Sequence, residues 1–186
     1  SSALVRNIAQ YNGETGEYYA FQADVSITQT RSEAGIFFCM SESEVYDGLE
    51  GYFIALTRSG LRAYMYTGTA ETGETVVEMG RTPLEEFELG MQFTLRVEIC
   101  GNICRIYLLD DADGVEPWPE YEFTLDNFQS GAVGIMDLGR GGVYSNIKFE
   151  TLEPETADTS LKYYQNPVLE GYADPVILYY DGVYYM

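Results

Sequence analysis

Histidine is absent from this chain of 186 residues, and only 10 basic residues stand against 30 acidic ones. Without histidine, the Ser-His and Cys-His nucleophile pairs of hydrolases are excluded, and so are Cys/His zinc sites. The sequence also lacks the Gly-x-Ser-x-Gly elbow, the phosphate-binding loop and the dinucleotide-binding fingerprint. Several large classes of enzyme are therefore not expected, and no set of metal ligands can be assigned.

The formal net charge is −20. A field of that sign repels nucleic-acid phosphates and anionic membrane surfaces, so neither is an expected partner. Neutral ligands, cations and basic partners remain open, and solubility alone is the simplest role for the charge. No apolar segment has the length of a membrane span, and no signal peptide is visible at the N-terminus.

Cysteine is scarce, with three residues in all. Cys100 and Cys104 flank Gly101-Asn102, which reads as the two-residue turn of a β-hairpin. In that register Cys100 lies opposite Ile103 and Ile99 lies opposite Cys104, so the two thiols point to opposite faces of the hairpin. We therefore predict free thiols and no disulfide between these two residues.

Aromatic residues are plentiful, since 17 tyrosines and nine phenylalanines favour strands over helices. After a polar entry segment at 1–16, the chain alternates from Tyr18 onward, with Phe21 and Val25 on one face and Asp24 on the other. We expect further strands at 34–40, 51–57, 61–67, 75–80, 93–99, 104–108, 120–125, 132–137 and 143–149. Turn signals separate them and no helical period is present, so the sequence predicts an all-β fold, an antiparallel β-sandwich.

Six short sequence patterns lie along these expected strands. They are Phe21-x-Ala23-Asp24-Val25, Ala34-Gly35-Ile36-Phe37-Phe38, Gly51-Tyr52-Phe53, Arg105-Ile106-Tyr107, Gly131-x-Val133-Gly134-Ile135 and Asn146-Ile147-x-Phe149. In this order they resemble the concanavalin-like and laminin-G-like sandwiches found beside glycosidases, most closely carbohydrate-binding module family 66. The resemblance implies a jelly-roll sandwich with a polysaccharide as its partner. Fructan is the best-known ligand of that family, although related sandwiches bind other glycans or none.

The last 21 residues follow a different pattern. They contain Asn166-Pro167-Val168-Leu169, an Asp174-Pro175 pair, an apolar run and an Asp181-Gly182 hairpin turn before a second aromatic run. This order resembles the opening of the five-bladed propeller of glycoside hydrolase family 43. The resemblance implies an inverting hydrolase of arabinosyl or xylosyl linkages, with Asp174 as the general base and the remaining catalytic acids beyond this chain. An ordinary Asp-Pro turn is the alternative.

The region between these two parts reads as a linker, because residues 153–162 lose the alternation and gain proline, threonine and acidic residues. The expected organisation is therefore a sandwich at 1–152, a linker at 153–162 and the truncated start of a catalytic propeller at 163–186. The chain as it stands is not expected to be an enzyme, whereas its parent is expected to be a glycoside hydrolase of the arabinofuranosidase or xylosidase type. The localisation is unknown, with an extracellular or cell-surface parent suspected.

One strand of the sandwich carries candidate sugar-binding residues. Arg62, Tyr64 and Tyr66 share a face, and neutral polysaccharides are usually bound by aromatic rings together with a few charged groups. An ordinary cross-strand aromatic ladder is the alternative. Glu50 and Tyr52 at the entrance of the preceding strand could add an acceptor and a ring, although Glu50 could equally be a solvated acid.

Two further candidates lie in or beside loops. Trp118 stands between two prolines and could be either a sugar platform or a plug over the end of the sandwich. Asp137 precedes the glycine-rich bend at 139–142 and is another acidic candidate. A structural calcium ion is conceivable, and residues 110–114 come nearest to a calcium loop without matching its full pattern. No other cofactor is expected.

Three functions remain open at this stage. The first is a carbohydrate-binding module tethered to a family 43-type hydrolase, which it would hold close to polymeric substrate. The second is a structural spacer that packs on the catalytic propeller and has no ligand of its own. The third is a sandwich-fold glycosidase, which would need paired carboxylates in a cleft.

Overall fold

The computed structural model describes residues 6–84, 86–109, 121–154, 178–180 and 183–185. The chain divides into two compact units, Ser1–Glu155 and Thr156–Met186. Eleven strands lie among the described residues of the first unit and two among those of the second. Within the same residues, no helix has the length and apolar character needed to cross a membrane.

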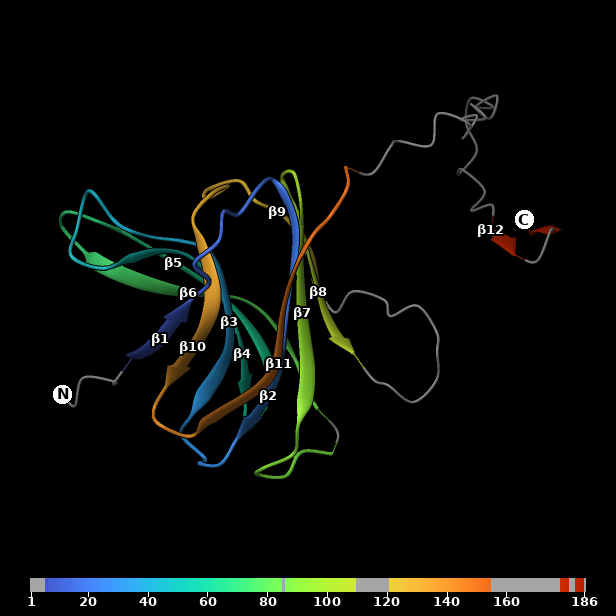
Figure 1. Cartoon of the computed structure of the whole chain (residues 1–186), viewed down its shortest axis with the longest axis horizontal. Coiled ribbons are helices and arrows are strands. Elements are labelled where there is room, and N and C mark those ends of the chain that lie inside the picture. Colours follow the sequence, from blue (N-terminus) through green and yellow to red (C-terminus); the bar gives the residue numbers. More distant parts are fainter. Residues whose placement is uncertain (1–5, 85, 110–120, 155–177, 181–182, 186) are drawn as a thin grey trace, which may run out of the picture. The chain divides into compact units, whose positions relative to one another are not determined.

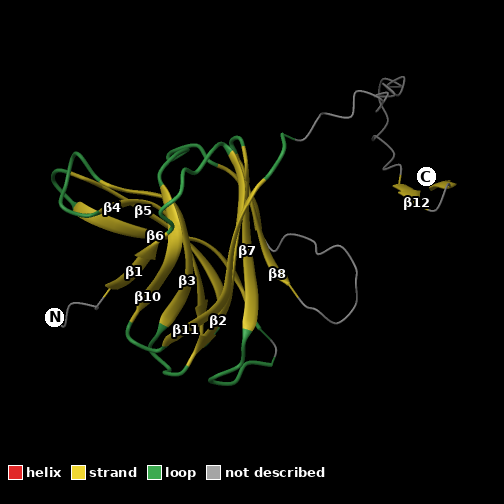
Figure 2. Ribbon diagram, in the orientation of Figure 1, coloured by secondary structure: helices red, strands yellow, loops and turns green. Residues whose placement is uncertain are grey.

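Two antiparallel sheets make up the first unit (Figure 1, Figure 2). The six-stranded sheet contains, in spatial order, β1 (Arg6–Gln10), β10 (Ala132–Leu138), β3 (Glu33–Glu42), β4 (Leu49–Thr57), β5 (Gly60–Thr69) and β6 (Gly73–Thr82). The five-stranded sheet contains β11 (Gly142–Thr151), β2 (Tyr18–Ile27), β7 (Phe93–Cys100), β8 (Ile103–Leu109) and β9 (Tyr121–Thr124). This arrangement confirms the predicted all-β antiparallel sandwich.

The core lies between the two sheets. From the five-stranded sheet, β2 contributes Phe21 and Val25, and from the other sheet β4 contributes Ile54 and Leu56, all at most 3% exposed. Burying a side chain of this size contributes about 1.5–3 kcal/mol relative to leaving it in water. Asp24 is an exception to the expected pattern: it lies on the outer face of β2 but is only 6% exposed, because side chains of neighbouring strands donate hydrogen bonds to its carboxylate.

The β7–β8 hairpin has the register predicted from its turn. Ile99 pairs with Cys104 and Cys100 pairs with Ile103. Cys39, Cys100 and Cys104 form no disulfide bond. Cys104 is buried in the core beneath the five-stranded sheet, and Cys100 lies half-buried on the other side of its hairpin. The predictions of opposite-facing, unbridged thiols are therefore confirmed.

The first strand, β1, is a departure from the sequence prediction, which placed a polar entry segment at 1–16. Arg6–Gln10 pairs antiparallel with β10, with Ile8 opposite Met136. All five residues of β1 are exposed, so they carry none of the apolar alternation by which a half-buried strand is recognised. The strand forms because the edge of β10 offers it hydrogen-bond partners.

The six-stranded sheet is strongly curled, and its outer face encloses a second apolar cluster. A flat sheet would hold the edge strands β1 and β6 about 24 Å apart, at about 4.8 Å per strand spacing. Instead, Arg6 of β1 forms an ion pair with Glu74 of β6. Where the two edge strands come together, they cover a cluster of outer-face side chains. Each of these side chains is at most 8% exposed: Phe37, Met40, Phe53, Ala55, Tyr64, Tyr66, Met136 and Leu138. The middle of this face is therefore closed to solvent.

The second unit contains one described hairpin. Strand β12 (Leu178–Tyr180) pairs antiparallel with β13 (Val183–Tyr185), and Tyr180 lies opposite Val183. This pairing confirms the hairpin predicted around Asp181-Gly182.

Candidate functional site

The candidate residues of β5 lie on the outer face of the six-stranded sheet. Leu61 and Ala63 enter the core between the sheets, whereas Tyr64 and Tyr66 belong to the outer-face cluster. Both rings are largely covered, since Tyr64 is 8% and Tyr66 2% exposed. Burial raises the pKa of Tyr64, which a hydrogen bond from Arg62 lowers in part, so its hydroxyl stays protonated at neutral pH. The two rings are therefore packed into the outer face, and the open part of this face is the end at which Arg62 lies.

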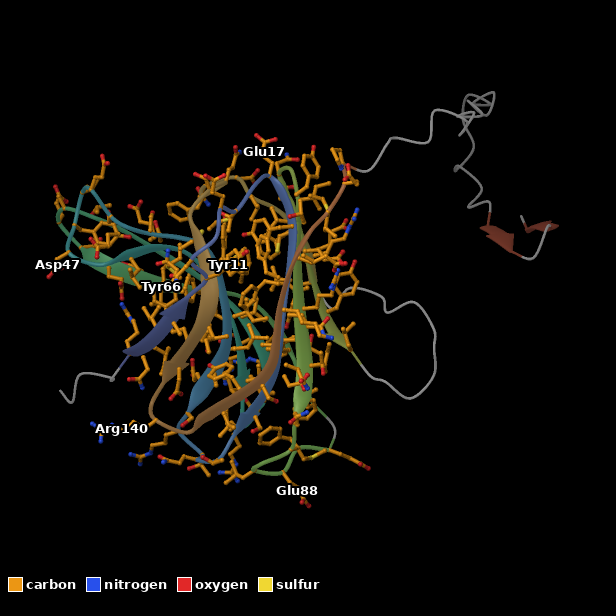
Figure 3. All side chains as sticks on the ribbon, in the orientation of Figure 1. Tyr11, Glu17, Asp47, Tyr66, Glu88 and Arg140 are labelled. Carbon is orange, nitrogen blue, oxygen red and sulfur yellow. The ribbon has the colours of Figure 1, made fainter. Side chains whose placement is uncertain are left out.

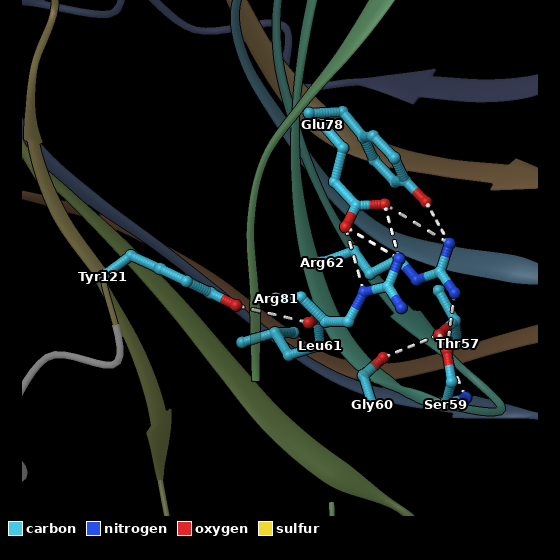
Figure 4. Close-up of polar contacts among 9 residues, drawn as sticks. Thr57, Ser59, Gly60, Leu61, Arg62, Glu78, Arg81 and Tyr121 are labelled. Atoms are coloured by element: carbon cyan, nitrogen blue, oxygen red, sulfur yellow. Dashed lines mark hydrogen bonds and ion pairs between the residues drawn. The ribbon is translucent and has the colours of Figure 1, made fainter. Parts of the chain in front are cut away.

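Arg62 stands at that end, within a network of polar side chains (Figure 4). Its Nη2 donates to Ser59 Oγ at 2.7 Å, and its Nη1 donates to Tyr64 Oη at 3.4 Å. Nη1 also lies 3.5 Å from Glu78 Oε2, and Glu78 is paired in turn with Arg81 at 2.9 Å. Among the described residues the buried Nε of Arg62 has no partner. Arg62 is thus held in place by Ser59, Tyr64 and Glu78, and its one unpartnered donor is buried.

A hollow of about 280 Å³ opens beside Arg62. The β2–β3 turn and the β4–β5 turn form its walls. All eight of its lining residues carry a charge or a hydroxyl group: Thr30, Arg31, Ser32, Glu33, Thr57, Arg58, Ser59 and Arg62. Sequence reasoning missed Arg31, Glu33 and Arg58, although two arginines in short turns are notable in a chain with only 10 basic residues.

The other end of the outer face has a different arrangement around the loop at 43–48. Glu74 pairs with Arg6 and also accepts a hydrogen bond from the Leu49 N–H at 2.8 Å. The Arg6 guanidinium lies 5.3 Å from the centre of the Tyr66 ring. A second hollow, of about 440 Å³, lies here and includes Arg6, Tyr46 and Leu49 in its lining. Figure 3 shows Asp47 of this loop at the left of the view, well apart from Arg140 at the lower left.

Glu50 belongs to the loop end rather than to the Arg62 end. Its Oε1 accepts a hydrogen bond from Ser43 Oγ at 2.7 Å. Ala55, five residues further along β4, is the residue that pairs with Arg62. At about 3.3 Å per residue, Glu50 and Arg62 are therefore separated by about 16 Å along the sheet. The structure does not bring these two predicted residues into one site.

Tyr52 lies inside the sandwich. It is 1% exposed, and its ring stacks on Phe38 with 5.3 Å between ring centres. It also meets the edge of Phe128 at 5.9 Å. These contacts place its ring out of reach of a ligand on the outer face. Tyr52 is therefore not part of the proposed binding surface.

Asp137 points away from the outer face as well, because its neighbours Met136 and Leu138 occupy that face. Its Oδ2 accepts a hydrogen bond from the Arg140 N–H at 3.0 Å, which holds the turn after β10. Its Oδ1 is buried and has no partner among the described residues. The contact that the structure shows is therefore a structural one within the turn.

Trp118, Asp174 and the acidic stretch 110–114 lie outside the described residues. Within the described part of the chain, no three Asp, Glu, Cys or His side chains gather closely enough to hold a metal ion. The site that the structure assembles therefore consists of Arg62 and Tyr64, with their polar network and the adjoining hollow.

Comparison with known proteins supports the fold. No family model and no curated protein matches the chain. Among solved structures, the carbohydrate-binding module CBM66 from Bacillus subtilis is similar, with 16% identity and a TM-score of 0.53 over 73% of this chain and 76% of that one. The xylan β-1,4-xylosidase from Bacillus halodurans C-125 is also similar, with 12% identity and a TM-score of 0.52 over 75% of this chain and 28% of that one. At these identities the likeness shows that the chain has the sandwich fold found in both proteins.

Proposed function

We propose that the sandwich at 1–152 is a non-catalytic carbohydrate-binding module. One observation carries the proposal: Arg62 is held in place beside an open hollow that is lined by charged and hydroxyl side chains. Guanidinium and hydroxyl groups in such a position can donate to and accept from sugar hydroxyls. The hollow is smaller than the usual range of about 300–1,000 Å³ for drug-sized ligands, so it suits one sugar unit at the end or edge of a chain.

Glu78, the acid that pairs with Arg62, fits binding better than catalysis. Glu78 bridges Arg62 and Arg81, so its oxygens are occupied by guanidinium groups. A glycosidase needs one carboxyl group that gives up a proton and a second that acts on water or sugar. A carboxylate fixed between two arginines does not suit either task.

The parent protein is proposed to be a family 43-type glycoside hydrolase. In this proposal residues 153–162 are the linker, and the segment at 163–186 begins a catalytic propeller in which Asp174 is the general base. Tethering raises the concentration of the enzyme at its polymer without any new catalytic contact. Such an enzyme would act outside the cell or at its surface.

Deletion of 1–152 from the parent tests the tethering. We expect activity on polymeric substrate to fall while activity on a small aryl glycoside stays unchanged, because only the polymer engages the module. An equal loss on both substrates would contradict the proposal.

The ligand is tested on the 186-residue chain by electrophoresis through gels that contain levan, inulin, arabinan or xylan. Retardation by one of these polymers, abolished in Arg62→Gln but kept in Lys148→Gln, is the expected result. Lys148 lies on β11 of the other sheet and provides a matched loss of one positive charge. Equal mobility in all of these gels and in a gel that contains glucuronoxylan would reject the binding function.

The spacer function has one observation in its favour. Val76, Val77 and Met79 on the edge strand β6 are 47%, 40% and 41% exposed. A run of exposed apolar side chains is typical of a surface that packs against another domain. If the chain binds none of the polymers, this function becomes the better account.

A further inference from the structure

Half of the basic residues lie at one end of the sandwich, although the chain as a whole carries −20. Five of its 10 basic residues lie on the turns and strand ends there: Arg31, Arg58, Arg62, Arg81 and Arg140. The β10–β11 turn that carries Arg140 packs on Ser32 of the β2–β3 turn, which places both turns at this end. Figure 3 shows Arg140 projecting from it.

Three of these arginines line the hollow beside Arg62, together with a single acid, Glu33. Arg31 and Arg58 are exposed, and neither forms an ion pair within the described residues. Arg62 is paired with Glu78, which lies outside the lining. The lining itself carries three cations against one anion, and two of the three cations have no ion pair among the described residues.

We propose that this hollow binds the carboxylate of an acidic sugar, a hexuronate unit within a glycan. The inference rests on the proposed carbohydrate-binding function and replaces the neutral polysaccharide expected from the net charge. An arginine fork matches a carboxylate with two parallel hydrogen bonds, and such charge-assisted bonds are about twice as strong as neutral ones. Ser59 and Thr30 add hydroxyl groups that suit the hydroxyls of the same sugar ring.

The charge of the rest of the protein restricts which acidic glycans fit. A net charge of −20 repels any polymer with closely spaced anionic groups, such as a nucleic acid or a heavily sulfated glycan. A polysaccharide with isolated uronate units on a neutral backbone brings one carboxylate to the arginines and little repulsion elsewhere. The hollow, at about 280 Å³, has room for one such unit.

The test compares glucuronoxylan with the same polymer after chemical reduction of its carboxyl groups, using titration calorimetry on the full chain. We expect binding to glucuronoxylan, at least tenfold weaker binding to the reduced polymer, and at least tenfold weaker binding of glucuronoxylan by Arg58→Gln. Lys148→Gln should bind like the wild type. Arg58 is exposed and unpaired within the described residues, so its replacement should leave the melting temperature unchanged.

Four other outcomes would contradict the ligand class, the carboxylate, the location of the site or the binding function. Equal binding of native and reduced xylan would overturn the acidic-sugar inference and leave the carbohydrate-binding function standing. Dextran sulfate bound as tightly as glucuronoxylan, with the same dependence on Arg58, would overturn the assignment to a carboxylate. Unchanged binding by Arg58→Gln would overturn the location. No binding to glucuronoxylan, reduced xylan, levan or arabinan would reject the carbohydrate-binding function itself.

Discussion

Arg6→Gln removes the ion pair that joins the two edges of the six-stranded sheet. Arg6 Nη2 lies 2.5 Å from Glu74 Oε1, and the guanidinium lies 5.3 Å from the centre of the Tyr66 ring. Because the two paired side chains are 32% and 19% exposed, solvent weakens the pair, which should contribute about 1 kcal/mol or less. The cation–π contact adds about 0.5–1 kcal/mol. We expect a loss of about 0.5–2 kcal/mol in all.

The assay is thermal unfolding followed by circular dichroism. For a unit of this size, 1 kcal/mol corresponds to about 2–4 °C in melting temperature, so Arg6→Gln should melt about 1–8 °C below the wild type. A double-mutant cycle with Glu74→Gln isolates the pair, and we expect a coupling energy of about 0.5–1 kcal/mol. The amide oxygen of the glutamine can still accept the hydrogen bond from the Leu49 N–H, so the cycle reports mainly the charge.

The pH dependence gives a second check. Burial raises the pKa of Glu74, but the Arg6 guanidinium and the Leu49 N–H outweigh it and hold this pKa below the usual 4.5. A carboxyl group with a lowered folded-state pKa stabilises the fold above its unfolded-state pKa, and this stabilisation is lost as the pH falls through the folded-state pKa. The difference between wild type and Arg6→Gln should therefore shrink below pH 4.5. A coupling energy of zero at pH 7 would refute the closure of the outer face by β1 and β6.

Two further predictions concern buried polar groups. Cys100 should react with a thiol reagent at pH 8 well before the other two cysteines do. Burial raises the pKa of Cys39 to about 11 and that of Cys104 well above its usual value, so both stay protonated. Three thiols that react equally fast would show that the core is open. Asp24→Asn should lower the free energy of unfolding at pH 7 by about 1–2 kcal/mol, since Thr94 Oγ1 and Asn146 Nδ2 donate charge-assisted hydrogen bonds to the Asp24 carboxylate. These same bonds lower the pKa of Asp24, so the difference should fade as the pH drops below the usual 3.8, and a constant difference in denaturant titrations down to pH 2 would contradict this cause.

The strands with clean alternation could be predicted from the sequence. In β2, Phe21 and Val25 are buried as expected, and in the β7–β8 hairpin the two-residue turn fixed the register of Cys100 and Cys104. Both features are local, since they depend on neighbours along the chain. The strand β1 was missed because its formation depends on β10, more than a hundred residues away.

The position of Tyr52 could not be predicted, because β4 is buried on both faces from Gly51 to Thr57. A strand of this kind has no alternation to show which side chains enter the core and which lie on the outer face. The stripe of Arg62 and Tyr64 was identified by its spacing, but the curl that covers the Tyr64 ring was not, since it results from the meeting of two distant edge strands.

The hollow at the arginine-rich end is likewise a product of tertiary structure. Arg31 and Arg58 belong to separate turns, each of which reads as an ordinary polar connection. They line one site only because β3 and β4 are neighbours in the sheet. A negative net charge also directs attention away from an anionic ligand, whereas the lining of the hollow carries three arginines against one glutamate.

The first measurement is hydrogen–deuterium exchange of the full chain in three samples: alone, with glucuronoxylan and with levan. It tests directly whether a glycan binds at the Arg62 end of the outer face. We predict that a bound glycan slows amide exchange in the turns around 30–33 and 57–62 and in the first half of β5. The β7–β8 hairpin on the other sheet should exchange at the same rate in all three samples. Protection confined to the five-stranded sheet, or none with either polymer, would contradict a glycan-binding site at this end of the outer face.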